Sequence, residues 1–391
     1  MKIEQLKWDN IGSYELFGRN KKVDKADLVM VFGSRGLISN NKLIDSIRKK
    51  YSSAHFIGCT TSGEILGTQV FDNSLTTTAI QFEATTIESA SVELIDSELS
   101  YKAGSELAQR LNKEGLAHIF ILSDGINVNG SRLAAGLKSC LPNNVSVTGG
   151  LAGDGILFTK TMTISESYAK EKSITAIGFY GDKIKIGFGS VGGWDSFGIE
   201  RVITKSKNNV LYEMDGKSAL ELYKTYLGEY AKDLPASGLL FPLSIRSKDS
   251  NKGVVRTILG INQEEQSMTF AGDVNQGYYA KLMKANIEGL LNGALDSAEL
   301  SISNLKRSPE LAILISCVGR KLVFNQRLEE EVETVREVIG EECLFTGFYS
   351  YGEVCPYTQI TNSHGNKVYK NEPGCLLHNQ TMTITTFVEE M

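Results

Sequence analysis

The sequence predicts an α/β fold of two related halves, each with a mixed sheet and covering helices. Short apolar runs typical of buried strands alternate with stretches of helical apolar spacing. The order strand, helix, strand, strand recurs three times along the 391 residues. In each recurrence the second strand ends at a pair of glycines separated by four residues. A unit of this kind contains a parallel crossover and an antiparallel neighbour, which together make a mixed sheet.

The first unit lies near the N-terminus. The run at 27–34 is largely apolar and ends in glycine and serine, which predicts a buried strand. Apolar residues at helical spacing follow over 43–51, and the second strand with its glycine pair follows over 55–64. The threonine-rich run 76–82 predicts the closing strand, because β-branched residues favour strands.

The middle unit repeats this scheme. It has an apolar strand at 118–124, a short helix through 133–137, and a second strand with a glycine pair over 145–155. The run 174–179 predicts its closing strand.

The last unit lies near the C-terminus. An apolar strand is expected at 311–317 and an amphipathic helix at 328–339, with Gly340 as its C-cap. The segment 344–353 carries the second strand and the glycine pair, and 381–387 predicts the closing strand.

The composition fits a chain of paired strands. Glycine is abundant and proline scarce, at 38 and 6 residues. Strands need the backbone amide that proline lacks. A degenerate fourth copy with a different element order is expected at 254–259 and 268–273.

The glycine pairs predict where a ligand binds. They are residues 58/63, 150/155 and 347/352. Glycine permits a sharp turn or a close approach by another backbone or a ligand. Glu64 and Glu353 follow the second glycine in two units, whereas the middle unit has Ile156 there. We therefore expect these strand ends to converge on a crevice that binds a small molecule.

Charge and hydropathy exclude two classes of partner. The chain has 41 basic and 46 acidic residues and no basic block, so we expect no nucleic acid. The N-terminus lacks the apolar run of a signal peptide, and no stretch approaches the roughly 20 apolar residues that span a bilayer. We expect no membrane insertion and a cytoplasmic location.

Cysteine usage also indicates an intracellular location, and the spacing of cysteines and histidines bears on metal binding. The six cysteines are scattered without a CxxC pair, which is typical of reduced intracellular thiols. The shortest Cys/His spacing, between Cys375 and His378, offers two ligands where zinc needs three or four, so we expect no metal site.

Several short segments resemble the motifs of the FIST domain. They are 58–65, 149–154, 215–220, 347–354 and 378–383. The resemblance spans about residues 25 to 390. It divides the chain into a FIST N-terminal domain at 1–205 and a FIST C-terminal domain at 206–391.

The resemblance implies a bacterial sensory input protein of signal transduction that binds a small-molecule ligand such as an amino acid. Similar proteins act with histidine kinases, cyclic-nucleotide enzymes or chemotaxis receptors. The chain ends eight residues after Thr383, so we expect no output domain of its own. The signal is then expected to pass to a separate partner such as the histidine kinase of a two-component system.

An amino-acid ligand would need a partner for each of its charges. Glu64 or Glu353 is expected to meet the ammonium and Arg320 the carboxylate, with Tyr349 and Tyr351 as walls on one face of an extended segment. The remaining candidate site residues are Cys59, Thr60, Thr61, Ser62, Asp154, Ser350 and His378.

Two alternatives stay open beside a sensor that binds without catalysis and without a cofactor. Some proteins that resemble this chain are haem-binding sensors of nitric oxide, and His378 is the better candidate ligand because it lies in a motif. The second alternative is an enzyme that uses the two glutamates or, as a hydrolase, Cys59. His55 is too far along the same strand to activate that thiol, at roughly 13 Å, so another histidine would have to approach it.

Overall fold

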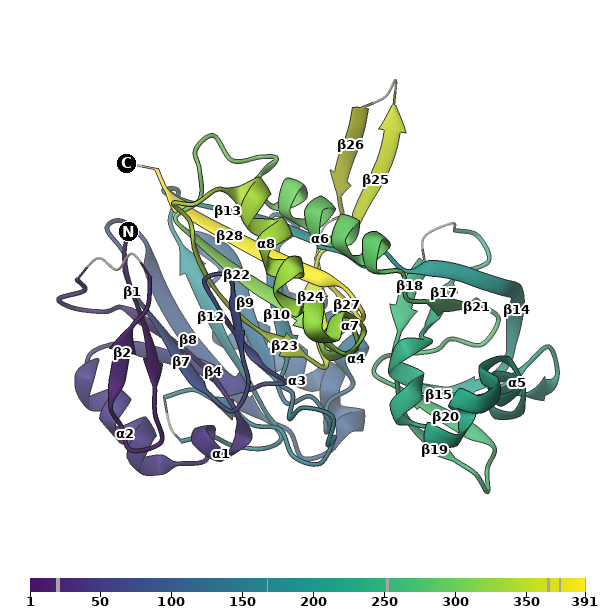
Figure 1. The fold of residues 1–391 in the computed structure, drawn as a ribbon. Helices are drawn as coiled ribbons and strands as arrows, with labels where there is room; N and C mark the ends of the chain where they lie inside the picture. The colour runs from purple at the N-terminus through teal and green to yellow at the C-terminus, as the bar shows by residue number, and fades with distance from the viewer. Residues whose placement is uncertain (19–21, 167, 251–252, 364–365, 373, 391) are drawn as a thin grey trace.

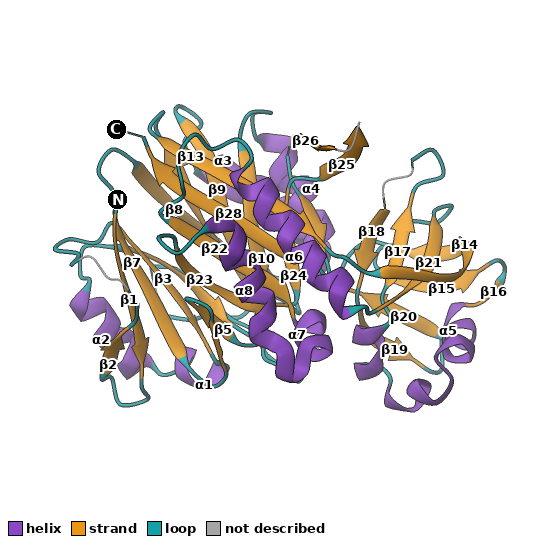
Figure 2. Ribbon diagram, turned by 45° about the horizontal axis from the view of Figure 1, so that its top comes forward, coloured by secondary structure: helices purple, strands orange, loops and turns teal. Residues whose placement is uncertain are grey.

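The computed structural model describes residues 1–18, 22–166, 168–250, 253–363, 366–372 and 374–390. These form three mixed sheets, each covered by helices on one face, together with a fourth sheet set to one side (Figures 1 and 2). The predicted mixed α/β fold with covering helices is confirmed.

The first sheet is built around the first unit. Its strand order is β11 (Thr163–Ile164), β4 (His55–Thr60), β3 (Leu28–Gly33), β7 (Leu75–Gln81), β1 (Lys2–Trp8) and β2 (Tyr14–Leu16). Helices α1 (Arg35–Ile38) and α2 (Asn41–Lys50) follow β3. The α2 helix buries Leu43, Ile44 and Ile47, the apolar stripe seen in the sequence.

The second sheet is built around the middle unit. Its order is β27 (Leu376–His378), β24 (Gly352–Cys355), β10 (Ser146–Leu151), β9 (Leu116–Ser123), β12 (Ser173–Tyr180) and β8 (Thr86–Glu93). Helices α3 (Ser100–Arg110) and α4 (Gly130–Cys140) pack against each other, and both contribute to the apolar core of this sheet.

The third sheet is built around the last unit. Its order is β13 (Ile184–Val191), β28 (Met382–Glu389), β22 (Leu311–Cys317), β23 (Leu344–Ser350), β5 (Glu64–Leu66) and β6 (Gln69–Phe71). The helices of this part are α6 (Ile287–Ile302), α7 (Val318–Phe324) and α8 (Leu328–Ile339).

The three sheets share one pattern of strand directions. In each, the first strand of the unit pairs in parallel with the second strand and antiparallel with the third. Their inner faces meet in one apolar core that includes Phe32, Phe120, Ile313 and Phe348. The rings of Phe32 and Phe348 lie 4.8 Å apart. Burying each such side chain contributes roughly 1.5–3 kcal/mol, so this core ties the sheets together.

The sheets also exchange strands in a cycle. The strand that leaves the first unit after its glycine pair, β5, joins the third sheet beside β23. In the same way β24 of the last unit joins the second sheet, and β11 of the middle unit joins the first. The exchange draws the ends of β4, β10 and β23 to one place.

A ring of main-chain hydrogen bonds closes this meeting point. They run from Ser62 N to Tyr349 O (2.8 Å), from Tyr351 N to Leu151 O (3.2 Å) and from Gly153 N to Thr60 O (2.9 Å). Each strand end is therefore hydrogen-bonded to the next, which satisfies backbone groups that the strand pairing leaves over.

The ring corrects the alignment of the middle unit. A Cβ added to Gly58, Gly149 or Gly347 would lie 2.3, 1.9 or 1.8 Å from a carbonyl oxygen of the parallel partner strand. These three glycines therefore occupy equivalent places, and the match of Gly150 with the other two was wrong by one residue. The close approach of the neighbouring strand, which cannot be read from the spacing, decides the register.

The correction also changes the counterpart of the two glutamates. Glu64 lies opposite Phe348, Glu353 opposite Gly150, and Thr163 opposite Cys59 in the exchanged strand pairs. The equivalent residue of the middle unit is thus Thr163 rather than Ile156.

The fourth sheet belongs to a β-domain at 195–284, inserted between β13 and α6 and seen at the right of Figure 1. Its elements are β14 (Asp195–Lys207), β15 (Val210–Met214), β16 (Lys217–Ser218), α5 (Ala219–Leu227), β17 (Leu243–Arg246), β18 (Gly253–Arg256), β19 (Ile258–Asn262), β20 (Ser267–Phe270) and β21 (Tyr279–Lys284). All of its strand pairs are antiparallel, so the expected fourth copy at 254–259 and 268–273 is wrong.

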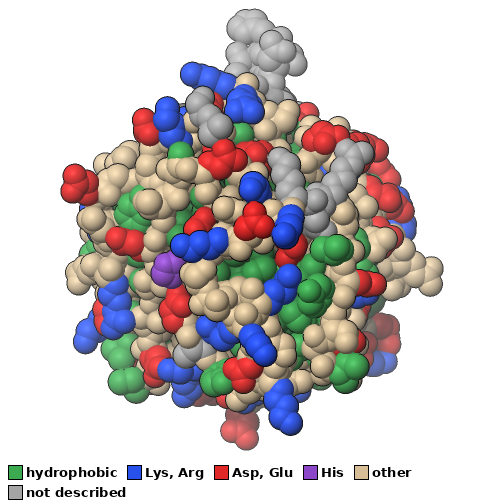
Figure 3. Space-filling model, turned by 90° about the vertical axis from the view of Figure 1, so that its left-hand side faces the viewer, with side chains coloured by type: hydrophobic (Ala, Val, Ile, Leu, Met, Phe, Trp, Pro, Cys, Tyr) green, Lys and Arg blue, Asp and Glu red, His purple; other side chains and the backbone are tan. Residues whose placement is uncertain are grey.

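Smaller elements complete the chain. Short 3-10 helices lie at Ser97–Leu99, Gly228–Asp233, Ala236–Leu240 and Asn325–Arg327. Strands β25 (Thr358–Ser363) and β26 (Asn366–Asn371) project from the body as a hairpin (Figure 1). Within the described ranges, no helix combines the length and apolar character needed to cross a membrane. On the face shown in Figure 3, charges of both signs are interspersed.

Candidate functional site

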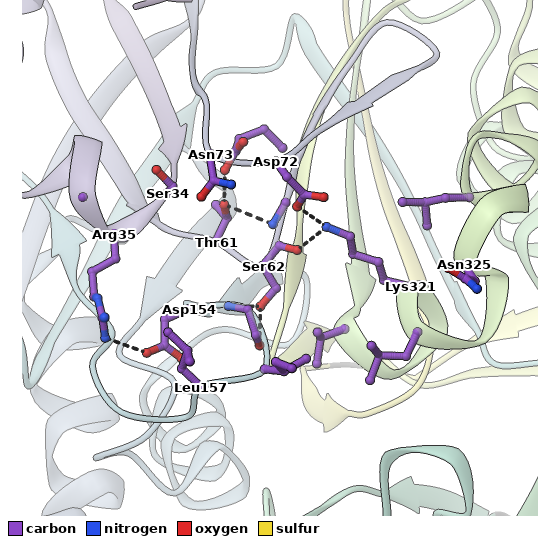
Figure 4. A pocket seen from close by; sticks show the side chains of 18 residues that line it. Ser34, Arg35, Thr61, Ser62, Asp72, Asn73, Asp154, Leu157, Lys321 and Asn325 are labelled. Carbon is purple, nitrogen blue, oxygen red and sulfur yellow. Dashed lines mark hydrogen bonds and ion pairs between the residues drawn. The ribbon is translucent and has the colours of Figure 1, made fainter. Parts of the chain in front are cut away.

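A pocket of about 590 Å³ lies beside the ring of strand ends. It is bounded by the ends of β3 and β4, the 72–73 turn, the loop after β10 and the helix α7 (Figure 4). All three units therefore contribute to it. Its size falls within the usual range of small-molecule sites, roughly 300–1,000 Å³.

Side chains of both charges line this pocket. Lys321 Nζ donates to Ser62 O at 2.8 Å and forms an ion pair with Asp72 (Figure 4). On the other side, Arg35 Nη1 lies 3.1 Å from Asp154 Oδ2. Asp72 and Arg35 are partly exposed, so one carboxylate and one guanidinium remain accessible to a ligand.

Asp154 anchors the loop after β10. It accepts hydrogen bonds from the amides of Thr159 and Lys160 at 3.1 and 2.9 Å and from the Tyr351 hydroxyl. Burial alone would raise the pKa of Asp154, but the hydrogen bonds from Tyr351, Lys160 and Thr159 lower it below the usual value. The carboxylate is thus charged and holds Arg35 in the pocket.

Glu64 forms the buried wall of the pocket. Its oxygens accept from the Ser74 hydroxyl at 2.5 Å, from Ser74 N at 3.2 Å and from the Thr61 hydroxyl. Burial raises the pKa of Glu64 to about 7, although the hydrogen bonds and the charge of Lys321 oppose this rise.

Glu353 repeats this arrangement in the last unit, outside the pocket. It accepts from the Ser350 hydroxyl at 2.6 Å and from the Thr381 hydroxyl at 2.8 Å, and burial raises its pKa to about 8. In the middle unit the Thr163 hydroxyl lies 2.6 Å from the hydroxyl of Ser173. The two glutamates are therefore equivalent parts of the fold.

These raised pKa values predict a pH-dependent stability. The folded chain keeps protons that an unfolded glutamate releases above its ordinary pKa of 4.5. Stability contributed by each glutamate is full below pH 4.5 and falls as the pH rises toward 7 to 8, by up to about 1.4 kcal/mol per pH unit. We expect the double variant Glu64→Gln/Glu353→Gln to lose this dependence.

Urea denaturation of the parent and the double variant across this pH range measures the effect. Other titrating groups cancel in the difference, and the exposed Glu265→Gln serves as the control. A difference that does not grow with pH would contradict the prediction.

The structure gathers part of the candidate set in the pocket. Thr61, Ser62, Glu64 and Asp154 line it. Thr60 is buried in β4, where its hydroxyl accepts from Met162 N at 3.1 Å.

Cys59 is also fully buried in β4. Burial, with the nearby Glu64 carboxyl, raises the pKa of its thiol well above the ordinary value. A thiol in this environment stays protonated and is a poor nucleophile.

Arg320 lies outside the pocket, on the buried face of α7. Its Nε lies 2.6 Å from Glu331 Oε1, its Nη2 donates to Leu290 O at 2.8 Å, and its Nη1 donates to Gly192 O. The guanidinium is fully buried, and each of its three nitrogens has a partner. Arg320 thereby ties α7 to Gly192 and Leu290, which lie on either side of the inserted β-domain.

The candidate tyrosines belong to different clusters. Tyr349 donates to Glu331 Oε2 at 2.9 Å, whereas Tyr351 donates to Asp154. Strand β23 ends at Ser350, so the alternation that predicted a shared face does not reach Tyr351. Of the two tyrosines, only Tyr351 has its hydroxyl hydrogen-bonded to pocket residues, Asp154 and Gly155.

None of the histidines that the structure describes lines the pocket. Both ring nitrogens of His118 are bonded to hydroxyls, at 2.7 and 2.9 Å, and His55 lies 2.8 Å from Glu166. His378 Nε2 lies 3.1 Å from Cys355 O, and burial lowers its pKa to about 4. His364 lies outside the described residues.

Sequence reasoning missed six polar residues of the pocket. They are Ser34, Arg35, Asp72, Asn73, Lys321 and Asn325. Two of them follow the first strand of the first unit directly, so the rule that ligands bind beyond strand ends could have found them. The others come from a turn and a helix that only the strand exchange brings near.

Comparisons with known proteins identify one family and several similar proteins, of which two are described here. An uncharacterized protein of Methanocaldococcus jannaschii is 25% identical over 398 positions, covering 90% of this chain and 74% of its own length. A crystal structure of cyanuric acid hydrolase from A. caulinodans covers 94% of this chain and 91% of its own, with 7% identity and a TM-score of 0.36. That similarity is too low to support a functional inference.

The family models cover most of the sequence. The FIST N domain matches residues 27–217 and the FIST C domain matches residues 219–356. FIST domains are associated with sensing in signal transduction. The chain therefore belongs to the FIST family.

Proposed function

We propose that this chain is a sensor whose pocket binds an amino acid or a similar small ligand. The observation that carries the proposal is the presence of accessible groups of both charges in a single pocket, among them Arg35, Asp72 and Lys321. An amino acid carries a carboxylate and an ammonium a few ångströms apart. The association of FIST domains with sensing supports the same reading.

The contacts suggest how such a ligand lies. Its carboxylate pairs with Arg35 or Lys321, since charge-assisted hydrogen bonds to a carboxylate are among the stronger polar contacts. Its ammonium pairs with Asp72. This residue is the ion-pair partner of Lys321, and its side chain is two-thirds exposed. Ligand binding then competes with the Lys321–Asp72 ion pair, which connects α7 to the turn after β6.

We propose binding without turnover. The buried thiol of Cys59 and the occupied oxygens of Glu64 and Asp154 support this view. The signal then passes to a separate cytoplasmic partner such as a histidine kinase. The scattered cysteines support an intracellular address, because all six are free thiols and five are buried.

Calorimetric titration with the twenty amino acids tests the proposal. We expect Lys321→Met to weaken binding of the best ligand at least tenfold, which is about 1.4 kcal/mol. Lys232→Met is the matched control, because Lys232 forms an exposed ion pair with Glu229 outside the pocket. Recovery of the unchanged ligand after incubation tests the absence of turnover. Failure of every amino acid to bind at millimolar concentration would refute the proposal.

A further inference from the structure

The pocket has a structural counterpart in the last unit. In each unit, a serine or threonine stands at or next to the start of the third strand. The residues directly before it are Asn73, Lys172 and Gln380. All three have a positive φ, of 53°, 50° and 64°, which residues other than glycine seldom adopt. They are therefore equivalent positions, and Gln380 of the last unit stands where Asn73 stands in the pocket.

In the last unit this place is already filled by the chain itself. Gln380 Nε2 donates to the carbonyl oxygen of Leu239 at 3.0 Å. Leu239 belongs to the Ala236–Leu240 turn of the inserted β-domain, which packs against α7, and it is 1% exposed. The occupant is thus the Leu239 carbonyl group, and the Leu239 side chain belongs to the apolar cluster that includes Val318 and Tyr351 at the strand ends of this unit.

In the first unit the equivalent place is open. Asn73 is exposed, and Figure 4 shows its side chain beside Ser34 and Thr61 on the pocket wall. The rim carries Ile156, Leu157 and Leu322, which are 62%, 57% and 39% exposed. Exposed apolar side chains gathered beside a polar pocket are typical of an interaction site.

We infer that the pocket takes a leucine-like residue, with a branched aliphatic side chain against the rim and a neighbouring carbonyl or carboxylate oxygen that accepts from Asn73 Nδ2. The inference rests on the proposed function and names the ligand class for the same site. Free leucine and leucine within a peptide share this chemistry. The filled counterpart shows that the fold accommodates such a group at this position.

Calorimetry with three probes tests the inference: L-leucine, N-acetyl-L-leucine amide and L-glutamate. We expect at least one leucine probe to bind tenfold more tightly than glutamate, and the stronger of the two identifies the source as a free amino acid or a peptide. Asn73→Asp keeps the size of the side chain and tolerates the positive φ but removes the donor. It should weaken leucine-probe binding at least tenfold without changing the melting temperature of the free protein.

Two further variants separate a binding role from a structural one. Asn73→Gln keeps an amide donor and introduces the side chain found at the equivalent Gln380. This variant should bind the leucine probe within about threefold of the parent. Leu322→Asp should weaken the leucine probe, whereas Leu16→Asp, at an exposed site on β2, should not. Tighter binding of glutamate than of both leucine probes, or unchanged leucine binding by Asn73→Asp, would overturn the inference while the sensor proposal stands. Absence of binding by every amino acid would overturn the proposed function alone, and absence of binding by both leucine probes as well would overturn the inference too.

Discussion

Gly347→Ala is expected to unfold the protein or to destabilise it by more than about 4 kcal/mol. The new Cβ would lie 1.8 Å from Leu314 O and 2.7 Å from Leu314 C on the parallel strand β22. Both atoms belong to the backbone, so no side chain can rotate away. Relief of the clash requires β22 and β23 to separate, which would break the ladder between them and disturb the strand end that joins the ring.

The matched control is Gly260→Ala. Gly260 also lies in a strand, β19, but an added Cβ meets no atom within 4 Å. We expect its free energy of unfolding to change by no more than about 1 kcal/mol. Urea denaturation followed by circular dichroism measures both variants. A Gly347→Ala protein as stable as the Gly260→Ala protein would show that the close approach of β22 and β23 is not a feature of the fold.

Arg320→Ala should cost about 3–5 kcal/mol of stability, because it leaves the Glu331 carboxylate buried without its cation. The same change removes the donors to Leu290 O and Gly192 O, on either side of the inserted β-domain. We therefore also expect faster hydrogen exchange in the two connecting segments than in the parent protein.

Two variants identify the cause of that loss. Arg327→Ala removes an ion pair with Glu330 whose side chains are 45% and 40% exposed, and it should cost less than about 1 kcal/mol. The double variant Arg320→Met/Glu331→Leu removes both buried charges and should recover most of the stability lost by Arg320→Ala. If Arg320→Ala were as mild as Arg327→Ala, the buried ion pair would not be what holds α7 in place.

The strands of the three units could be predicted from the sequence because their signal is local. A strand buried on both faces is apolar over most of its length, as in 28–33, 118–123 and 311–317, and no partner has to be known to recognise it. The inserted β-domain has short strands with mixed burial, and β14 pairs with β21 far along the chain. Its pattern therefore resembled a degenerate repeat.

The candidate site was predicted only in part. The repeat pointed to Thr61, Ser62, Glu64 and Asp154 because they follow the second strands of their units. Arg320 looked equally suitable, since nothing in the sequence shows that its helix turns that side chain inward toward Glu331. Lys321, the next residue, reaches the pocket instead.

By itself the sequence determined the class of the fold, the three strand-rich units and the family, because apolar periodicity and short motifs are properties of contiguous residues. Only the tertiary structure decided which strand of each unit pairs into the sheet of a neighbouring unit. It thereby showed that Thr163 is the counterpart of the two glutamates. The same exchange placed Arg35, Asn73 and Lys321 around one pocket. The reason is physical: strand exchange is set by hydrogen bonds and close backbone contacts between residues far apart in the chain, and these leave no local trace.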